Sequence, residues 1–323
     1  MIVGGTWQDR GVTDRLMLLD TASLYFRAFY GVPDSIRRAD GTPVNAVRGL
    51  ADIIARLVSD FEPTHLVACW DDDWRPHWRV ELIPSYKAHR VAELVPCGPD
   101  VEEVPAALAA QVPMIRELLT ELDVTVIGKP DHEADDVIGS LAAQATMPID
   151  VVTGDRDLFQ LIDDARAVRV IYTARGMSRL EVLTDVSVVA KYGVLPAQYA
   201  DFAVLRGDAS DGLPGVPGIG DKTAASLLRQ FVDLDGLVAA ASDPTAPLSA
   251  GMRAKIIGAA DYLEVSPTVV EVVRDLDLGE FAARIRPLDT AHLAEVERLA
   301  AEWNLGGSAQ RVLRALGNDV AAT

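Results

Sequence analysis

The densest group of side chains that could do chemistry is an acidic stretch at residues 130–137, with the sequence PDHEADDV. It opens a predicted helix, around which Glu133 and Asp136 lie about 60° apart and Asp135 lies about 100° from Asp136, so all three could border one site. Asp131 alone would cap this helix, whose dipole favours each acidic side chain by only about 0.3–1 kcal/mol. The surplus carboxylates indicate a cation, although a solvated acidic first turn would explain the stretch if it stood alone.

Carboxylates also follow three other apolar runs that have the composition of strands. The acids after the runs 16–19, 66–70 and 149–154 are Asp20, Asp71, and Asp155 with Asp157. In open parallel sheets the ligand site lies beyond the carboxyl ends of the strands, so four strand ends would bring acids to one crevice. Three consecutive acids follow residue 70, and we prefer Asp71 over Asp72 as the candidate ligand because it comes directly after the strand.

Two more acids, Asp208 and Asp211, lie further along the chain. Carboxylates without histidine or cysteine partners favour hard cations such as Mg²⁺ or Mn²⁺. Their number exceeds one octahedral site, whereas two ions about 3.5–4 Å apart would use them and would stabilise the attacking and leaving oxygens of a phosphoryl displacement. Hydrolysis of a phosphodiester by metal-activated water is the chemistry that we infer.

The elements that would position these acids alternate between strands and helices up to about residue 175, which predicts an α/β fold with a doubly wound, mostly parallel sheet. The clearest helix runs from Asn45 to Phe61, because its apolar side chains fall on one stripe. Another helix is expected at 113–123. From residue 185 onward the chain is expected to be mainly helical.

The composition fits a soluble globular protein of 323 residues, with 49% hydrophobic and 24% charged residues. The two cysteines cannot form a disulfide framework, and there is no apolar run long enough for a membrane span or a signal segment. We therefore expect a cytoplasmic protein without a membrane partner. The net charge of −18 argues against a polyanionic partner, so nucleic-acid binding would depend on local basic groups and bound cations.

Residues 72–99 interleave basic and aromatic side chains without a clean apolar stripe. Such a segment suits phosphates and stacked bases, but a surface helix whose tryptophans pack locally explains the composition equally well.

A second feature of interest is the glycine-rich turn at 215–220, which precedes a predicted helix beginning at Lys222. Its amides would face the helix N-terminus and form a phosphate cradle beside Lys222. Carbonyls on the other side of such a turn could hold a monovalent cation.

Eight motifs, taken in order, closely resemble those of the flap endonuclease family. They are Leu19-Asp20, Pro43-x-Asn45-Ala46-Val47, Trp70-Asp71, Tyr86-Lys87-Ala88-His89-Arg90, Glu133-Ala134-Asp135-Asp136, Gly154-Asp155-Arg156-Asp157-Leu158, Gly207-Asp208-x-Ser210-Asp211 and the hairpin from Gly215 to Ala224. The most similar form is the bacterial 5′-nuclease, found alone or as the N-terminal domain of DNA polymerase I. The match runs from about residue 16 to 290, so the chain resembles a stand-alone bacterial flap endonuclease.

The resemblance implies a role for each matching residue. The divalent ions would be bound, directly or through water, by Asp20, Asp71, Glu133, Asp135, Asp136, Asp155, Asp157, Asp208 and Asp211. Lys87 and Arg90, at the base of a helical arch, would hold the scissile phosphate. DNA would be contacted by Arg27, Tyr30, Arg75, Arg79, Gly215, Gly218, Gly220, Lys222 and Thr223. A potassium ion would be held by backbone carbonyls, for which Val216 and Ile219 are the candidates.

The predicted domain organisation has four parts. They are an N-terminal extension at 1–15, an α/β metal-dependent nuclease domain at 16–184 with its arch at about 72–100, a helical duplex-DNA-binding region at 185–290 with a hairpin of the helix-hairpin-helix type at 213–224, and a C-terminal helical tail at 291–323.

The predicted function is that of a monomeric, structure-specific 5′ nuclease of replication and repair. It would act on duplex DNA with a 5′ flap, a nick or a 5′ end, as flap endonuclease and 5′-3′ exonuclease, by a two-metal mechanism with Mg²⁺ or Mn²⁺. The alternatives are a non-catalytic DNA-junction binding protein and a metal-dependent ribonuclease.

Overall fold

The computed structural model of the chain describes residues 14–95 and 98–319. Most of the expected N-terminal extension at 1–15 therefore lies outside the described residues. No described helix is long and apolar enough to cross a membrane.

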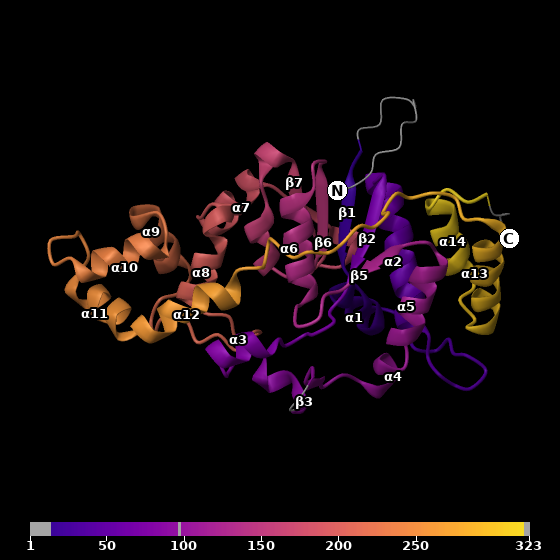
Figure 1. Cartoon of the computed structure of the whole chain (residues 1–323), viewed down its shortest axis with the longest axis horizontal. Helices are drawn as coiled ribbons and strands as arrows, with labels where there is room; N and C mark the ends of the chain where they lie inside the picture. Colours follow the sequence, from indigo (N-terminus) through magenta and orange to yellow (C-terminus); the bar gives the residue numbers. More distant parts are fainter. Residues whose placement is uncertain (1–13, 96–97, 320–323) are drawn as a thin grey trace.

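A six-stranded sheet forms the centre of the protein (Figure 1). Its strands are β1 (Leu16–Asp20), β2 (His65–Cys69), β5 (Thr125–Ile127), β6 (Ile149–Thr153), β7 (Val168–Tyr172) and β8 (Glu181–Leu183). They are arranged in the order β5-β2-β1-β6-β7-β8, and every neighbouring pair is parallel except β7 and β8. β1, β2 and β6 are buried along their whole length, as expected for parallel strands that are covered on both faces. The predicted doubly wound, mostly parallel sheet is confirmed.

Helices cover both faces of the sheet, and successive residues of β1 divide between two cores. Met17 and Leu19 pack with α1 (Thr21–Gly31), α2 (Asn45–Phe61) and α5 (Val112–Glu121), whereas Leu16 and Leu18 pack with α6 (Ala134–Gln144). This division follows from the two-residue period of a strand. The helix predicted from Asn45 to Phe61 has these bounds in the structure.

The segment expected to form a helical arch is only partly helical. It contains α3 (His77–Leu82), the short 3-10 helix η1 (Ala88–Arg90) and an antiparallel pair, β3 (Val91–Glu93) with β4 (Val101–Glu102); α4 (Ala106–Ala109) then leads to α5. Pro84 lies beyond the C-terminal cap of α3, and Gly98 has a φ of 141° between the two strands. Proline and this backbone conformation interrupt any continuous helix here.

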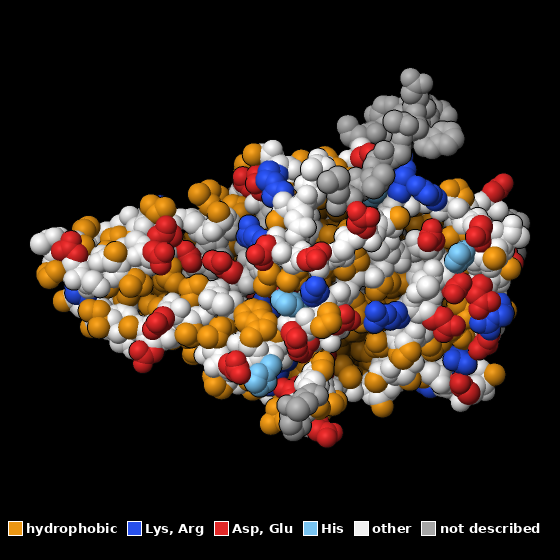
Figure 2. All heavy atoms as spheres, viewed as in Figure 1, with side chains coloured by type: hydrophobic (Ala, Val, Ile, Leu, Met, Phe, Trp, Pro, Cys, Tyr) orange, Lys and Arg blue, Asp and Glu red, His pale blue; other side chains and the backbone are white. Residues whose placement is uncertain are grey.

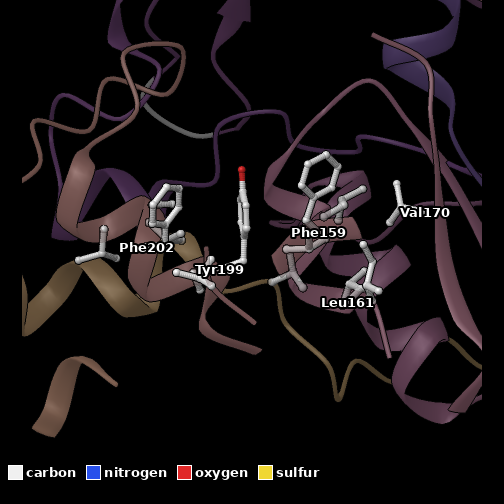
Figure 3. Packing of buried hydrophobic residues seen from close by; sticks show 14 of the residues in the cluster. Phe159, Leu161, Val170, Tyr199 and Phe202 are labelled. Carbon is white, nitrogen blue, oxygen red and sulfur yellow. The ribbon is translucent and has the colours of Figure 1, made fainter. Parts of the chain in front are cut away.

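The helical region lies beside the sheet, at the left of Figure 1. Its helices are α7 (Asp185–Tyr192), α8 (Tyr199–Arg206), α9 (Asp221–Phe231), α10 (Leu234–Ser242), α11 (Ala250–Gly258) and α12 (Ala260–Val270), and the 3-10 helix η5 (Pro196–Gln198) lies between α7 and α8. Three more 3-10 segments belong to the sheet domain: η2 (Asp157–Leu161), η3 (Asp164–Arg166) and η4 (Met177–Arg179). Figure 3 shows Tyr199 of α8 next to Phe159, and their ring centroids are 5.3 Å apart. The helical region and the sheet therefore share one continuous core.

After α12 the chain runs back across the sheet domain and ends in α13 (Thr290–Glu302) and α14 (Gly307–Ala315) (Figure 1). The returning segment is held by backbone hydrogen bonds, from Leu66 N to Ala283 O at 2.8 Å and from Ile285 N to Thr64 O at 2.9 Å. Val296, Leu299 and Trp303 are buried in the core that contains α2. The C-terminal helices thus complete one face of the sheet domain.

Candidate active site

Eight of the nine predicted acids line two adjoining cavities at one end of the sheet. The four strands that they follow, β5, β2, β1 and β6, are consecutive neighbours in the sheet, so their carboxyl ends lie side by side. A hollow of about 390 Å³ is lined by Asp20, Asp71, Glu133, Asp135, Asp155 and Asp208, together with Lys87 and Arg90. A smaller cavity of about 20 Å³ is lined by Glu133, Asp135, Asp157 and Asp211. Glu133 and Asp135 thus belong to both cavities.

Asp20 is fixed at the junction of β1 and α1. One carboxylate oxygen accepts a hydrogen bond from Ser23 N at 3.1 Å and caps the helix, and the other accepts one from Thr153 Oγ1 at 2.6 Å. Burial raises the pKa of Asp20 to about 6 in spite of these hydrogen bonds. Ser23 and Thr153 also orient the Asp155 loop, because Gly154 N donates to Ser23 Oγ and Asp155 N donates to Thr153 Oγ1. Sequence reasoning missed both hydroxyl residues.

Of the three consecutive acids after β2, Asp71 is the one that lines the hollow. Its Oδ1 accepts a hydrogen bond from Ala134 N at 2.8 Å, which joins the end of β2 to the start of α6. Burial raises the pKa of Asp71 to about 7, and the nearby charges of Glu133 and Asp20 act in the same direction. Asp72 instead lies against Gly128 and approaches Arg116 at 4.0 Å. The preference for Asp71 agrees with this geometry.

The N-terminus of α6 differs from the predicted arrangement. Asp131 was expected to cap the helix, but it lies in a left-handed turn with a φ of 60°, and the cap is Glu133. The Asp136 carboxylate closes a capping box by accepting from Glu133 N at 3.2 Å. Glu133 also accepts hydrogen bonds from Tyr86 Oη at 2.6 Å and from Lys87 Nζ.

Asp136 does not line either cavity, which contradicts its prediction as a metal ligand. Its side chain is fully buried, and Arg79 donates to both carboxylate oxygens at 2.7 and 2.9 Å. Val273 N donates to Oδ1 at 2.9 Å. Both oxygens are therefore engaged in a structural ion pair. The angular argument predicted that Glu133, Asp135 and Asp136 could border one site, but in the structure only Glu133 and Asp135 line the cavities, because Asp136 faces the interior.

Asp135 and Asp157 are two buried carboxylates that face other acids across the cavities. Burial and the repulsion of neighbouring carboxylates hold the pKa of each well above its ordinary value. Asp157 Oδ1 is buried and finds no hydrogen-bond partner in the described part of the chain. Within residues 14–95 and 98–319, no three acidic, histidine or cysteine side chains converge into a ready-made metal cage. The site is a hollow ringed by mutually repelling carboxylates, and this all-oxygen donor set fits hard divalent cations.

The helical region contributes Asp208 and Asp211 through the loop after α8. This loop is joined to the base of the arch, because Lys87 N donates to Asp211 O at 2.9 Å and Ser85 Oγ donates to Gly212 O at 2.8 Å. At Gly212 φ is 70°, and a Cβ would collide with Ser85 O, so only glycine fits this contact. Burial raises the pKa of Asp211 to about 6.

The two predicted catalytic cations both line the hollow and are both paired with acids. Lys87 is buried, its Nζ donates to Glu133, and the charge of Glu133 helps to raise the pKa of Lys87 although burial opposes this. Arg90 donates to Glu102 Oε1 from Nε at 3.0 Å and from Nη2 at 2.5 Å. Glu102 was not predicted as a site residue. It follows the arch in sequence, and only the pairing of β3 with β4 places it next to Arg90.

Two arginines that were predicted to contact DNA are interior residues. Arg75 is 5% exposed and donates to Tyr86 O at 2.6 Å and to Asp100 at 2.5 Å, while Arg79 is 2% exposed. Because neither guanidinium reaches solvent, the prediction of direct DNA contact by these residues is wrong for this structure.

Arg27 and Tyr30, by contrast, line a more apolar hollow of about 830 Å³ that adjoins the acidic one. Tyr30 is 72% exposed, and Arg27 Nε has no hydrogen-bond partner among the described residues.

The predicted hairpin leads into α9, whose N-terminal cap is Gly220. Lys222 is exposed in the first turn of α9 and Thr223 is half-buried there, whereas Gly215 is buried against Gly207 and does not face solvent.

Of the two candidate potassium ligands in this hairpin, Val216 has its carbonyl engaged in the turn. Val216 O accepts a hydrogen bond from Ile219 N at 3.0 Å, and the carbonyl between them, Gly218 O, accepts one from Lys255 Nζ at 3.0 Å.

Comparisons with known proteins agree with this architecture. Residues 15–193 match the family described as 5'-3' exonuclease, N-terminal resolvase-like domain, and residues 194–291 match 5'-3' exonuclease, C-terminal SAM fold. A 5'-3' exonuclease of Streptomyces coelicolor is 58% identical and covers 93% of this chain and 99% of its own length. One of Mycobacterium tuberculosis is 47% identical and covers 93% of this chain and 97% of its own length.

Solved structures show the same fold at low identity. The crystal structure of the T5 D15 protein co-crystallized with metal ions has a TM-score of 0.62 and 16% identity, covering 94% of this chain and 99% of that one. The catalytic core of Rad2 in complex with DNA substrate has a TM-score of 0.58 and 15% identity, covering 94% and 92%.

A resolvase-like sheet with carboxylates at four strand ends, continued by a helical SAM fold, defines a class of nucleases. The chain belongs to the 5'-3' exonuclease family. The predicted resemblance to flap endonucleases, the fold class and the assignment as a nuclease are thereby confirmed.

Proposed function

We propose that this nuclease hydrolyses DNA phosphodiesters at 5′ flaps, nicks and 5′ ends with two or more divalent ions, Mg²⁺ or Mn²⁺. The observation that carries the proposal is the convergence of partly buried carboxylates from four neighbouring strand ends and from the loop after α8. The T5 protein was crystallised with metal ions and the Rad2 core with DNA substrate, which adds support.

In this proposal, the ions would be held in the larger hollow by Asp20, Asp71, Asp155 and Asp208, in the smaller cavity by Asp157 and Asp211, and between the two by Glu133 and Asp135. When bound, they would activate water and stabilise negative charge on the reacting phosphate. They would also relieve the repulsion that raises the pKa values of the acids, and Asp136 has no place in this set.

Lys87 and Arg90 would bind the scissile phosphate in the same hollow. Lys87 Nζ already lies at its acidic wall, so a phosphate that replaced Glu133 as its partner would be held next to the carboxylates. Arg90 would provide a second, forked donor once it leaves Glu102.

DNA beyond the scissile bond would be bound in two places. Arg27 and Tyr30 would bind the strand that enters the adjoining apolar hollow, and Lys222 with the amides after Gly218 would bind duplex phosphates at the hairpin. Acidic side chains are spread over the face in Figure 2, with basic ones in small groups between them. An acidic protein of this kind would concentrate its DNA affinity in a few such places.

We also propose that the protein is a monomer, since one chain supplies every acid of the site. The cytoplasm is proposed as its location because a free thiol such as that of Cys69 suits a reducing compartment. A potassium ion at the hairpin would be bound by Ile219 O and by the second lone pair of Val216 O, whose other lone pair accepts from Ile219 N. Because Lys255 Nζ already donates to Gly218 O, this potassium site is the least supported part of the proposal.

A cleavage assay with flap DNA, nicked duplex and single-stranded RNA, in Mg²⁺, Mn²⁺ and chelator, tests the proposed function. We expect metal-dependent cleavage of flap DNA by the wild type and less than about a tenth of that turnover by Asp135→Asn, with wild-type binding of the same DNA in Ca²⁺. Binding without cleavage by the wild type would instead support a junction-binding protein, and preferential cleavage of RNA would support a ribonuclease.

A further inference from the structure

Arg79 is a buried cation at the edge of the site that donates five hydrogen bonds, and the proposed chemistry assigns it no role. A guanidinium has five N–H donors. Nε donates to Val269 O at 3.0 Å, and Nη1 donates to Glu133 and to Asp136 at 2.9 Å each. Nη2 donates to Asp136 at 2.7 Å and to Glu271 O at 3.5 Å. Every donor therefore has a partner, and these partners come from two distant segments of the chain.

The first of these segments is the start of α6. Glu133 borders both acidic cavities, and Asp135 lies between Glu133 and Asp136 in sequence. Because Arg79 holds the residues on either side of Asp135, it fixes the first turn of α6 and with it the direction in which Asp135 faces the cavities.

The second segment is the C-terminal end of α12. Val269 lies in its last turn and Glu271 is its C-terminal cap, where carbonyls lack helical partners and a cation is favoured by the helix dipole. α12 is in turn fastened to α8, because Tyr262 Oη donates to Val204 O at 3.1 Å. The loop that follows α8 carries Asp208 and Asp211.

We propose that Arg79 is a positioning residue that holds the two halves of the acidic site, the α6 half with Asp135 and the α8-loop half with Asp208 and Asp211, in one fixed relation. A lysine cannot replace it, since an ammonium has three donors and no planar fork that spans both segments. The proposal rests on the proposed function, because it assumes that both halves bind the same ions. Its geometric core, the link between α6 and α12, does not depend on metal or DNA.

Arg75 provides a matched control for the test. It is also a buried arginine of the same segment and also pairs with a carboxylate, but its partners are Asp100, Pro84 O and Tyr86 O, all within the arch. Arg75→Met therefore removes a buried guanidinium without touching α6 or α12. The test variants are Arg79→Met and Arg79→Lys. The lysine variant keeps a positive charge next to Asp136, so we expect it to be destabilised less than the methionine variant.

The first measurement is hydrogen exchange of the metal-free, DNA-free protein at a temperature where all variants are folded. We expect at least tenfold faster exchange in both 133–138 and 266–273 for Arg79→Met and Arg79→Lys, and in neither segment for Arg75→Met. Faster exchange in only one segment, or equal changes in the Arg75 control, would overturn the link, whether or not the wild type cleaves DNA.

The second measurement compares binding with chemistry. For Arg79→Lys we expect at least tenfold weaker Mn²⁺ binding by calorimetry and at least a tenfold loss of single-turnover rate on saturating flap DNA, with the DNA Kd in Ca²⁺ changed less than threefold. Wild-type Mn²⁺ affinity and rate in this variant would refute the positioning role. A wild-type protein that neither binds Mn²⁺ nor cleaves DNA would refute the proposed function itself. In that case the hydrogen-exchange experiment alone would test whether Arg79 links α6 to α12.

Discussion

Replacing Asp71 by asparagine tests the electrostatic description of the site, because it removes the charge and keeps the shape. The side-chain oxygen of the introduced asparagine can still accept from Ala134 N, the bond that Asp71 makes at 2.8 Å. Burial raises the pKa of Asp71 from 3.8 to about 7. The folded state thus holds the proton of Asp71 more tightly than the unfolded state does. The contribution of this proton to the free energy of unfolding is fully present below pH 3.8 and is lost as the pH rises from there through about 7.

The difference between these pKa values corresponds to about 4 kcal/mol of destabilisation at pH 8 as an upper limit. Metal-free Asp71→Asn should therefore be more stable than wild type by up to about 4 kcal/mol at pH 8, and by about half of that at pH 5.5. Urea unfolding in chelator at both pH values measures this difference. Mg²⁺ at about 100 times its Kd should then stabilise the wild type by about 2.7 kcal/mol and the variant by less.

Asp72→Asn is the matched control, since Asp72 is the adjacent acid and does not line the hollow. The variant at Asp71 should gain stability at pH 8 and the one at Asp72 should not. Equal stabilities of the two variants, or a gain at Asp71 that is independent of pH, would refute the conclusion that burial and repulsion destabilise the empty site.

Three further predictions concern cleavage and binding. Asp135→Asn should leave less than about a tenth of wild-type turnover even in saturating Mn²⁺, because it removes the charge of a carboxylate that lines both cavities, and retained turnover would argue against its proposed role as a metal ligand. Lys87→Met should lower the single-turnover rate on the order of 10²-fold with little change in DNA Kd, and a loss confined to Kd would make Lys87 only a binding contact. Lys222→Ala should weaken binding to all duplexes alike and should lower the slope of log affinity against log salt concentration by about one, as measured by fluorescence anisotropy in Ca²⁺, while the saturated complex cleaves at nearly the wild-type rate. An unchanged slope together with a much lower cleavage rate would instead place the hairpin in the active site.

The acids at the strand ends were predictable from sequence because the geometry of a parallel sheet alone brings them together. Asp20, Asp71 and Asp155 each follow an apolar run that forms a strand. Because β2, β1 and β6 are adjacent in the sheet, the three carboxylates lie close together at its edge. The same holds for the helix from Asn45 to Phe61, whose apolar stripe is local information.

Arg79 was assigned wrongly because its burial depends on residues that are remote in the chain. A basic residue among tryptophans has the composition of a DNA-binding surface, and nothing local reveals that Asp136 and the end of α12 enclose it. Ser23 and Thr153 escaped notice for the same reason, since hydroxyl side chains show their importance only once β1 and β6 are adjacent. At the start of α6, the choice between Asp131 and Glu133 as cap depended on a backbone turn that the composition does not determine.

The contact of α14 with the sheet domain has a consequence for the synthesis of the protein. Asp52 of α2 accepts hydrogen bonds from Arg311 at 2.8 and 3.0 Å and from Ser308 at 3.1 Å, and the buried faces of both helices belong to one core. A ribosome that adds about 5–20 residues per second makes α14 roughly 10–50 s after α2. Throughout that time the apolar side of α2 lacks the cover that α14 gives it in the folded protein, so this face of the sheet domain can be completed only after residues 307–315 have been made.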